Sequence, residues 1–426
     1  MALRPSFAAE RVLTPDADPA WARERDKAIR ARLEQGDLES MVNFLLLGTS
    51  FTKQPRIDME SITEASKTGV LRARVDDLVA GLRHPGGNER LIFLQGLLRR
   101  QGIDPESGGA EAGVFLFKTL SRVAQERMDI AKRAAQTDSK SPRDRGSLFQ
   151  DRGLSLDTSI IPAFTIEQTL RDLKIRGELR GGQAARVAVI GPGLDFIDKN
   201  EESAFDYYPP QTLQPFALYD SLVRLGLASP KDLSVLVFDI SPRVIDHLQR
   251  ARERARKNSG YAIQLPRDIA RPWPQGMIDY WNSLGDRVGT PITPIHPPAI
   301  FFFNAHNAST VRLPGLATRA VRVRPDVVLA CEPLDLDIIV ERLNLAPAER
   351  FDLIVATNIF VYYEPSEQTL ALENAGAMLK PGGLLLTNDL LPEAPGGSMR
   401  QAGNTIVPLD SPGISARQAV GWYRKQ

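Results

Sequence analysis

Cysteine and long apolar runs are both scarce in this sequence. Its single cysteine, Cys331, excludes an internal disulfide and any metal site built from several cysteines, and it fits a reducing compartment. The N-terminus lacks the apolar core of a signal peptide, and runs such as FLLL at 44–47 and IFFF at 300–303 are far below the roughly 18 residues of a membrane span. We therefore expect a soluble cytoplasmic protein without a membrane partner.

Charge of one sign is not in excess either. The 53 Lys and Arg residues against 52 Asp and Glu leave a formal net charge of +1, which gives no overall attraction to nucleic acid or to an anionic membrane. We expect no nucleic-acid partner. The basic run RARERARK at 250–257 continues an amphipathic pattern and is predicted to be the solvated face of a helix.

Several catalytic motifs are missing. The sequence contains no Gly-x-Ser-x-Gly elbow and no Gly-x-x-x-x-Gly-Lys-Ser/Thr loop, which disfavours hydrolase and NTPase functions. No group of His, Cys, Asp and Glu residues has the spacing of metal ligands, so no metal site is predicted.

The residue pattern of the sequence changes near residue 160. Before it, residues 19–135 show helical periodicity, with separate units at 69–83, 88–101 and 110–135. Residues 136–160 are polar and punctuated by Pro and Gly, as in a linker or mobile loop. We predict an all-α domain at 1–135 and an α/β domain at 161–426.

Apolar runs rich in Val, Ile and Leu alternate with helical patterns in the second part. Such runs are typical of parallel strands buried on both faces of a doubly wound sheet. The predicted strands lie at 186–190, 234–238, 326–330, 351–356 and 383–387.

Candidate binding residues follow four of these strands. The turn Gly191-Pro192-Gly193 comes directly after the first strand, and the second ends on Asp239, which can accept both hydroxyls of a ribose. Asp239 could instead cap the helix that begins near Ser241-Pro242. The third run ends on Glu332, with Asp335 and Asp337 as alternatives. Thr357 and Asn358 follow the fourth strand.

The stretches FDLIVATNIFVYYE at 351–364 and LKPGGLLLTND at 379–389 complete this series. Together, residues 185–426 resemble the class I S-adenosylmethionine (SAM)-dependent methyltransferase family, and the closing AVGWYRKQ is similar to the last, antiparallel strand of that family. The resemblance implies a Rossmann-like fold, SAM as cofactor and methyltransferase activity. The cofactor-binding residues that it implies here are Gly191, Pro192, Gly193, Asp195, Asp239, Ile240, Glu332, Thr357 and Asn358.

The sequence also departs from that family. Val189 stands where an acidic residue is usual, and Asp195 where a third glycine is frequent. Gly191 and Asp239 lie 48 residues apart, since 239 − 191 = 48, against about 20 in a compact dinucleotide fold. We therefore predict insertions at about 196–232, with a helix starting near Thr212, and at about 258–320.

Substrate-contacting residues are predicted less directly. Tyr207, Tyr208, Tyr362 and Tyr363 are candidates for a substrate wall, with the alternative that some are core tyrosines. Candidates for a catalytic base are Tyr208, His296 and His306.

The predicted reaction moves a methyl group from SAM to an O, N or C nucleophile of a small molecule or peptide. Part of the stretch at 358–383 is similar to the chemotaxis-receptor glutamate methyltransferases, which makes a protein carboxylate an alternative acceptor. A nicotinamide-dependent oxidoreductase and a catalytically silent binding module with the same fold are further alternatives. The oligomeric state is left open.

Overall fold

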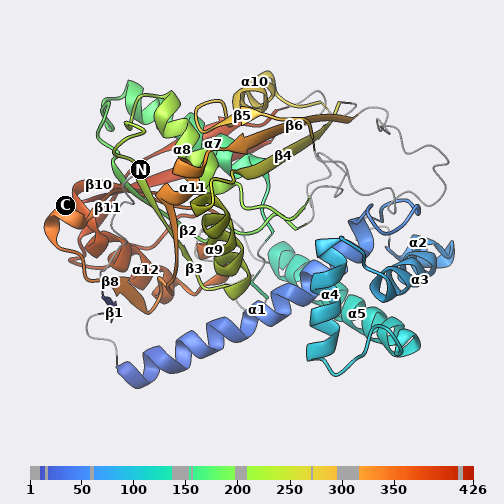
Figure 1. The fold of residues 1–426 in the computed structure, drawn as a ribbon. Helices are drawn as coiled ribbons and strands as arrows, with labels where there is room; N and C mark the ends of the chain where they lie inside the picture. The colour runs from blue at the N-terminus through green and yellow to red at the C-terminus, as the bar shows by residue number, and fades with distance from the viewer. Residues whose placement is uncertain are drawn as a thin grey trace.

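A computed structural model describes residues 10–14, 18–57, 62–136, 153–154, 157–196, 209–269, 272–294, 316–410 and 416–426 (Figure 1). Within these ranges no helix is both long enough and apolar enough to cross a membrane.

A seven-stranded sheet forms the centre of the α/β region. Its strand order is β11-β12-β10-β9-β2-β3-β7. The strands β7, β3, β2, β9 and β10 are parallel, whereas β12 runs antiparallel to both of its neighbours. The bounds are β2 Arg186–Ile190, β3 Ser234–Asp239, β7 Cys331–Asp335, β9 Phe351–Ala356, β10 Leu379–Thr387, β11 Met399–Pro408 and β12 Arg417–Lys425. This confirms the predicted doubly wound α/β class and the antiparallel last strand.

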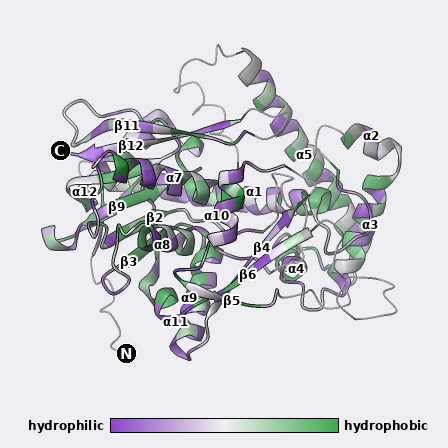
Figure 2. Ribbon diagram, turned by 90° about the horizontal axis from the view of Figure 1, so that it is seen from above, coloured by the Kyte–Doolittle hydropathy of each residue, from purple (hydrophilic) through white to green (hydrophobic). Residues whose placement is uncertain are grey.

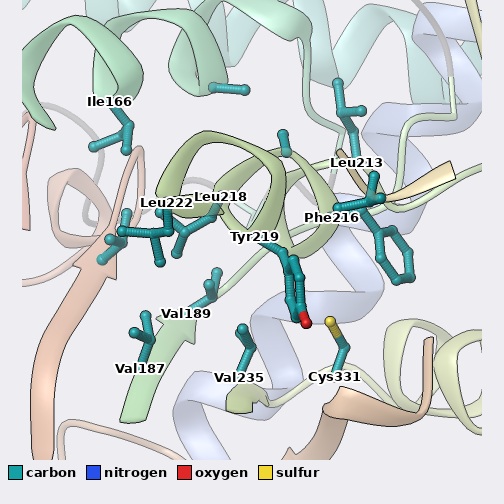
Figure 3. Packing of buried hydrophobic residues seen from close by; sticks show 14 of the residues in the cluster. Ile166, Val187, Val189, Leu213, Phe216, Leu218, Tyr219, Leu222, Val235 and Cys331 are labelled. Carbon is teal, nitrogen blue, oxygen red and sulfur yellow. The ribbon is translucent and has the colours of Figure 1, made fainter. Parts of the chain in front are cut away.

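Helices cover both faces of this sheet. Alternate strand residues belong to different cores: Val187 and Val189 pack with α7, α8 and α9, whereas Ala188 and Ile190 pack with α1 and α12. Figure 3 shows Leu218 and Leu222 of α8 above β2. The bounds are α7 Ile160–Ile175, α8 Gln214–Arg224, α9 Pro242–Arg256 and α12 Pro365–Met378. The helix predicted to start near Thr212 is α8, which begins at Gln214.

One predicted strand is wrong. Residues 326–330 belong to a short helix, α11 (Pro325–Ala330), and the strand begins only at Cys331. An apolar run of five residues fits a buried helix as well as a strand. Pro325 at the first helical position tips the balance because its ring presets a helical φ.

The N-terminal helices form a separate apolar core. They are α1 Pro19–Leu47, α2 Ile62–Lys67, α3 Val70–Arg83, α4 Glu89–Arg100 and α5 Gly109–Gln136, in agreement with the predicted helical units. Figure 2 shows hydrophobic and hydrophilic residues alternating along α5, as expected for a helix with one buried face. Asn88 caps α4 by accepting hydrogen bonds from the backbone N–H groups of Arg90 and Leu91.

Helix α1 contributes to two cores. Ala22 and Ile29 in its first half pack with the sheet residues, whereas Met41 to Leu46 pack among α3, α4 and α5. In Figure 1 it runs below the sheet toward the helical cluster. The short strand β1 (Arg11–Leu13) also pairs with β8 (Glu341–Leu343). The domain boundaries at 135 and 160 stay a prediction.

A small antiparallel sheet lies largely within the predicted insertion at 258–320, and its last strand continues to Val323. It has the order β4-β6-β5, formed by β4 Tyr261–Asp268, β5 Gly289–Pro291 and β6 Leu316–Val323, and it is accompanied by α10 Gln275–Ser283. Two 3₁₀ turns, η2 Pro347–Glu349 and η3 Phe360–Tyr362, flank β9.

Candidate functional site

The glycine turn lies where the strand order reverses. β2 has β3 on one side and β9 on the other, and open α/β sheets bind ligands at the carboxyl edge of that switch point. Gly191 has φ +60° and Gly193 φ +70°, values that favour glycine. A Cβ added at Gly191 would lie closer than 3.0 Å to Ile359 Cδ1. The space beside Gly191 is therefore filled by a side chain of this protein, that of Ile359.

Asp239 ends β3, as predicted, and is 5% exposed. Its Oδ1 accepts a hydrogen bond from the backbone N–H of Ser241 at 2.8 Å, so it also supports the start of α9. Burial raises the pKa of this carboxyl to about 7, although the hydrogen bond from Ser241 and the charge of Arg243 act in the opposite direction.

The structure moves the third candidate along the chain. Glu332 is the second residue of β7 rather than its tip, because the strand starts at Cys331. Asp335 ends β7, faces Asp239 in the register and accepts a hydrogen bond from Arg30 Nη2 at 2.8 Å. Glu332 therefore lies away from the carboxyl edge that it was predicted to occupy.

Asp337, the other alternative, has the more informative environment. It is 1% exposed, and its Oδ1 accepts a hydrogen bond from the Ile339 N–H at 3.0 Å. Its buried Oδ2 has no hydrogen-bond partner among the described residues. Burial raises the pKa of Asp337 to about 7.

Asp239 and Asp337 line one small cavity of about 60 Å³ at the carboxyl edge. The predicted cofactor residues Gly191, Gly193 and Ile240 line it as well. The remaining walls are Leu33, Leu154, Ile190, Phe238, Leu336, Ile338, Ile359, Tyr362 and Tyr363. The structure thus brings Gly191, Gly193, Asp239 and Ile240 together as predicted, and it places Asp337 where Glu332 was expected.

The other predicted cofactor residues are not part of this lining. Pro192 is buried within the turn. Asp195 forms a backbone bridge with Gln211, and its Oδ2 accepts a hydrogen bond from Gln211 Nε2 at 3.3 Å. Glu332 lies farther back along β7.

Thr357 and Asn358 lie past the tip of β9 and are likewise outside the cavity lining. Thr357 Oγ1 accepts a hydrogen bond from Gln214 Nε2 at 2.7 Å. Asn358 has φ +59° and is exposed, and its N–H donates to Asn388 Oδ1 at 2.7 Å. A non-glycine residue in this conformation is uncommon and is held here by the neighbouring strand ends.

The tyrosine and histidine predictions have separate outcomes. Tyr362 and Tyr363 line the small cavity, and Tyr363 is 5% exposed within a hydrophobic core. Tyr207, Tyr208, His296 and His306 lie outside the described residues.

The sequence pattern did not identify Leu33 and Leu154, the two lining residues that we call the roof of the cavity. Leu33 of α1 and Leu154 line it, and Leu154 N–H donates to Arg32 O at 3.0 Å. Arg30 Nη1 donates to Ile240 O at 3.1 Å, and Arg32 Nη1 donates to Tyr362 O at 2.8 Å. These pairs join residues far apart in the chain, and no local pattern in a single sequence predicts such contacts.

In the part of the chain that the structure describes, no three His, Cys, Asp or Glu side chains are grouped so that they could hold a metal ion.

Comparisons with known proteins do not identify a family for this chain. No protein-family model matches the chain, and no curated protein does. Among solved structures, the chain is similar to the magnesium protoporphyrin IX methyltransferase of Synechocystis PCC 6803 with bound SAM, at 9% identity over 62% of this chain and 81% of that chain, with a TM-score of 0.27.

Two other solved structures are similarly distant. TrmN from Thermus thermophilus matches at 13% identity over 62% of this chain and 52% of that chain, with a TM-score of 0.27. A TehB-like SAM-dependent methyltransferase from Corynebacterium glutamicum matches at 11% identity over 63% of this chain and all 100% of that chain, with a TM-score of 0.23. Such scores carry no argument about activity, and the local similarity to chemotaxis-receptor methyltransferases is not shown. The strand order itself establishes a Rossmann-like fold of the class I methyltransferase type, preceded by a helical N-terminal region.

Proposed function

We propose that this protein is a SAM-dependent methyltransferase that moves a methyl group to an O, N or C nucleophile of a small molecule or peptide. The observation that carries the proposal is the pair of buried carboxyls, Asp239 and Asp337, in one cavity beside the Gly191 turn. Buried carboxyls with unmet hydrogen-bonding capacity are costly unless a ligand satisfies them.

The residue types fit the nucleoside part of the cofactor. A carboxylate at the tip of the second strand can accept hydrogen bonds from both ribose hydroxyls, which is the role proposed for Asp239. The unpartnered Oδ2 of Asp337 is an acceptor that suits the amino group of adenine. The main chain at Gly191 and Gly193 would lie against the remainder of the cofactor.

The present cavity is too small for the whole cofactor. Its volume is about 60 Å³, whereas pockets for ligands of this size hold roughly 300–1,000 Å³. Cofactor binding therefore requires that Leu33, Leu154 and Ile359 move away from the glycine turn. All three belong to the walls described above, and the first two are carried by α1 and the segment bound to it.

The strand order supports SAM rather than a nicotinamide dinucleotide. Dinucleotide-binding Rossmann sheets have the order 3-2-1-4-5-6. Here the antiparallel β12 is inserted between β10 and β11, as the resemblance to class I methyltransferases implies.

The chemistry asks little of the protein beyond alignment. When bound, SAM supplies an electrophilic methyl group whose bond electrons return to sulfur, while the nucleophile provides the electron pair of the new bond. Holding the reactants in line supplies roughly 7–11 kcal/mol through effective concentration. A carboxylate placed against the sulfonium would stabilise the ground state more than the transition state. Asp239 and Asp337 are therefore expected to bind the nucleoside end of SAM, away from the sulfonium.

Calorimetric titration with SAM tests this proposal. Asp239→Asn and Asp337→Asn should each weaken binding about tenfold or more, because a charge-assisted hydrogen bond contributes about 1.5–3 kcal/mol. Glu332→Gln is the matched control on the adjoining strand and should leave affinity unchanged. Failure of the wild type to bind SAM at millimolar concentration, or an equal loss in the control, would contradict the proposal.

A further inference from the structure

A second, larger cavity lies on the other side of the segment that follows the glycine turn. Its volume is about 740 Å³, within the range of small-molecule pockets. Its walls come from α4, from residues 194–196 and 209–211, from α9 and from the start of β4. Gly193 lines the small cavity whereas Leu194 and Phe196 line the large one. The two cavities are therefore neighbours across one short segment.

One wall of the large cavity is strongly cationic. Arg243, His247, Arg250 and Arg254 of α9 all line it, and their spacing of three and four residues places them on one face of the helix. Among the residues that the structure describes, Glu89 is the acidic residue in the lining. Asp37 pairs with Arg243, and Asp246 lies 3.9 Å from the exposed Arg250. The positive potential of this wall therefore comes mainly from the exposed guanidinium groups of Arg250 and Arg254. Arg250 and Arg254 belong to the run predicted as a solvated face: they are exposed, and they also border the cavity.

Arg243 is held in a fixed position against two aromatic rings. Its guanidinium carbon lies 4.4 Å from the Phe93 ring centroid and 5.3 Å from that of Phe196. Its Nη2 is 3.5 Å from Asp37 Oδ1, an ion pair, yet Nε, Nη1 and Nη2 are buried without a hydrogen-bond partner among the described residues. Rings that stack on the guanidinium fix its plane, and its buried nitrogens lie behind the surface of the cavity. Arg243 therefore adds positive charge to the wall without exposing its N–H groups.

The polar side chains of His247 and Tyr261, which line the cavity, already have hydrogen-bond partners. His247 Nε2 and Tyr261 Oη are 2.7 Å apart, and the backbone N–H of Thr212 donates to Tyr261 Oη at 2.8 Å. Burial and the charges of Arg254, Arg250 and Arg243 lower the pKa of His247 to about 4, so its ring is neutral at pH 7. The cationic groups available to a ligand are therefore the arginines.

We propose that this cavity binds a small anionic molecule whose carboxylate or phosphate group pairs with Arg250 and Arg254, with the buried charge of Arg243 beside them. Phe93, Phe196 and Ile92 provide apolar surface for the body of the molecule. Because the cavity adjoins the glycine turn, this molecule is the methyl acceptor, a role that rests on the function proposed above.

Titration of the full-length protein in the absence of SAM tests the site by itself. The probes are phenyl phosphate and benzoate, with phenol and benzamide as their uncharged counterparts. At low ionic strength we expect at least one anion to bind at millimolar concentration or below and its neutral counterpart not to bind, with salt weakening the binding. Comparison of the affinities for phenyl phosphate and benzoate shows whether phosphate or carboxylate is preferred. If neither anion binds, or if the neutral probes bind equally well, the proposal is wrong.

Variants on one helix locate the binding. Arg250→Gln and Arg254→Gln alter exposed side chains and should keep the fold, and together they should weaken anion binding about tenfold or more. Arg243→Gln tests the stacked arginine. Arg256→Gln, on the opposite face of α9 and outside the cavity lining, is the matched control. An equal loss in Arg256→Gln would overturn the assignment. Because SAM is not used, loss of this proposal and loss of the methyltransferase proposal are separate results.

Discussion

At the scale of single residues, the main feature of the sheet edge where the parallel strands end is a set of buried carboxyl groups. Burial raises the pKa of Asp239 and Asp337 to about 7 and that of Asp389, just past β10, to about 6. Asp389 Oδ2 accepts the N–H of Phe360 at 3.1 Å and so supports the turn after β9. Sequence reasoning identified Asp239 because it ends an apolar strand. It chose Glu332 over Asp335 and Asp337, because it placed the strand at 326–330 whereas β7 begins at Cys331.

Asp239→Asn should stabilise the protein above neutral pH. The ordinary pKa of 3.8 is raised to about 7 in the folded state, so the folded protein holds this proton more tightly than the unfolded chain. The resulting stability is complete below about pH 4 and is lost as the pH rises to about 7. Asparagine cannot ionise, yet its oxygen still accepts the N–H of Ser241.

Unfolding curves at a series of pH values provide the measurement. The advantage of Asp239→Asn over the wild type should grow from pH 4 to pH 8 and reach on the order of 3 kcal/mol. Asp76→Asn, at an exposed position in the N-terminal helices, is the control for the loss of a carboxyl group. An asparagine variant no more stable than the wild type at pH 8 would refute the burial argument.

Gly191→Ala should destabilise the fold for two separable reasons. Its positive φ costs about 1–2 kcal/mol in any L-residue, and its Cβ would collide with Ile359. Gly382 has φ +76°, and a Cβ added there would meet no atom within 4 Å, so Gly382→Ala reports the conformational cost alone.

The collision can be isolated by a double-mutant cycle. Gly191→Ala should lose more free energy of unfolding than Gly382→Ala, and Ile359→Ala should recover the excess when it is combined with Gly191→Ala. Additive effects of the two substitutions would show that Ile359 does not occupy the space at Gly191.

Helix α1 contributes Leu33 to the wall of the small cavity and is tied to the carboxyl edge by several contacts. Its first half is fixed by Arg30 to Ile240 O and Asp335, by Arg32 to Tyr362 O and by Arg25 to Glu367. Gly36 lets the Leu154 carbonyl approach so closely that a Cβ would lie under 3.0 Å from its oxygen. The helix itself was predictable from its periodicity. Its docking was not, because the partners lie on strand ends far along the chain.

Arg30→Ala should loosen the first half of α1. It removes hydrogen bonds to Ile240 O and to Asp335 together with the pair to Asp26. Amide hydrogen exchange should become faster in residues 19–36 and stay unchanged in 37–47, which pack in the helical core. Lys27→Ala, an exposed position on the same helix, is the control. Unchanged exchange in Arg30→Ala would show that these contacts do not hold the roof.

At the scale of the whole molecule, the large cavity lies where two apolar cores meet, with Leu194 and Tyr261 from one and Phe196 from the other, whereas the apolar lining of the small cavity belongs to a single core. Four of the five parallel strands and the glycine turn could be predicted from local patterns in the sequence, and the antiparallel last strand from the family resemblance. The run at 326–330 could not be assigned correctly, since apolar runs of that length suit both helix and strand. The cavity walls come from segments distant in sequence, which explains why the arginines of α9 were predicted only as a solvated face.

The most direct test is a crystal structure of the full chain grown with S-adenosylhomocysteine, the product that methyl transfer leaves. We predict the ribose against Asp239, the adenine beside Asp337, and Leu33, Leu154 and Ile359 displaced from the positions described above. A nucleoside bound elsewhere, or a carboxyl edge unchanged at saturating ligand, would contradict the assignment of this edge as the cofactor site.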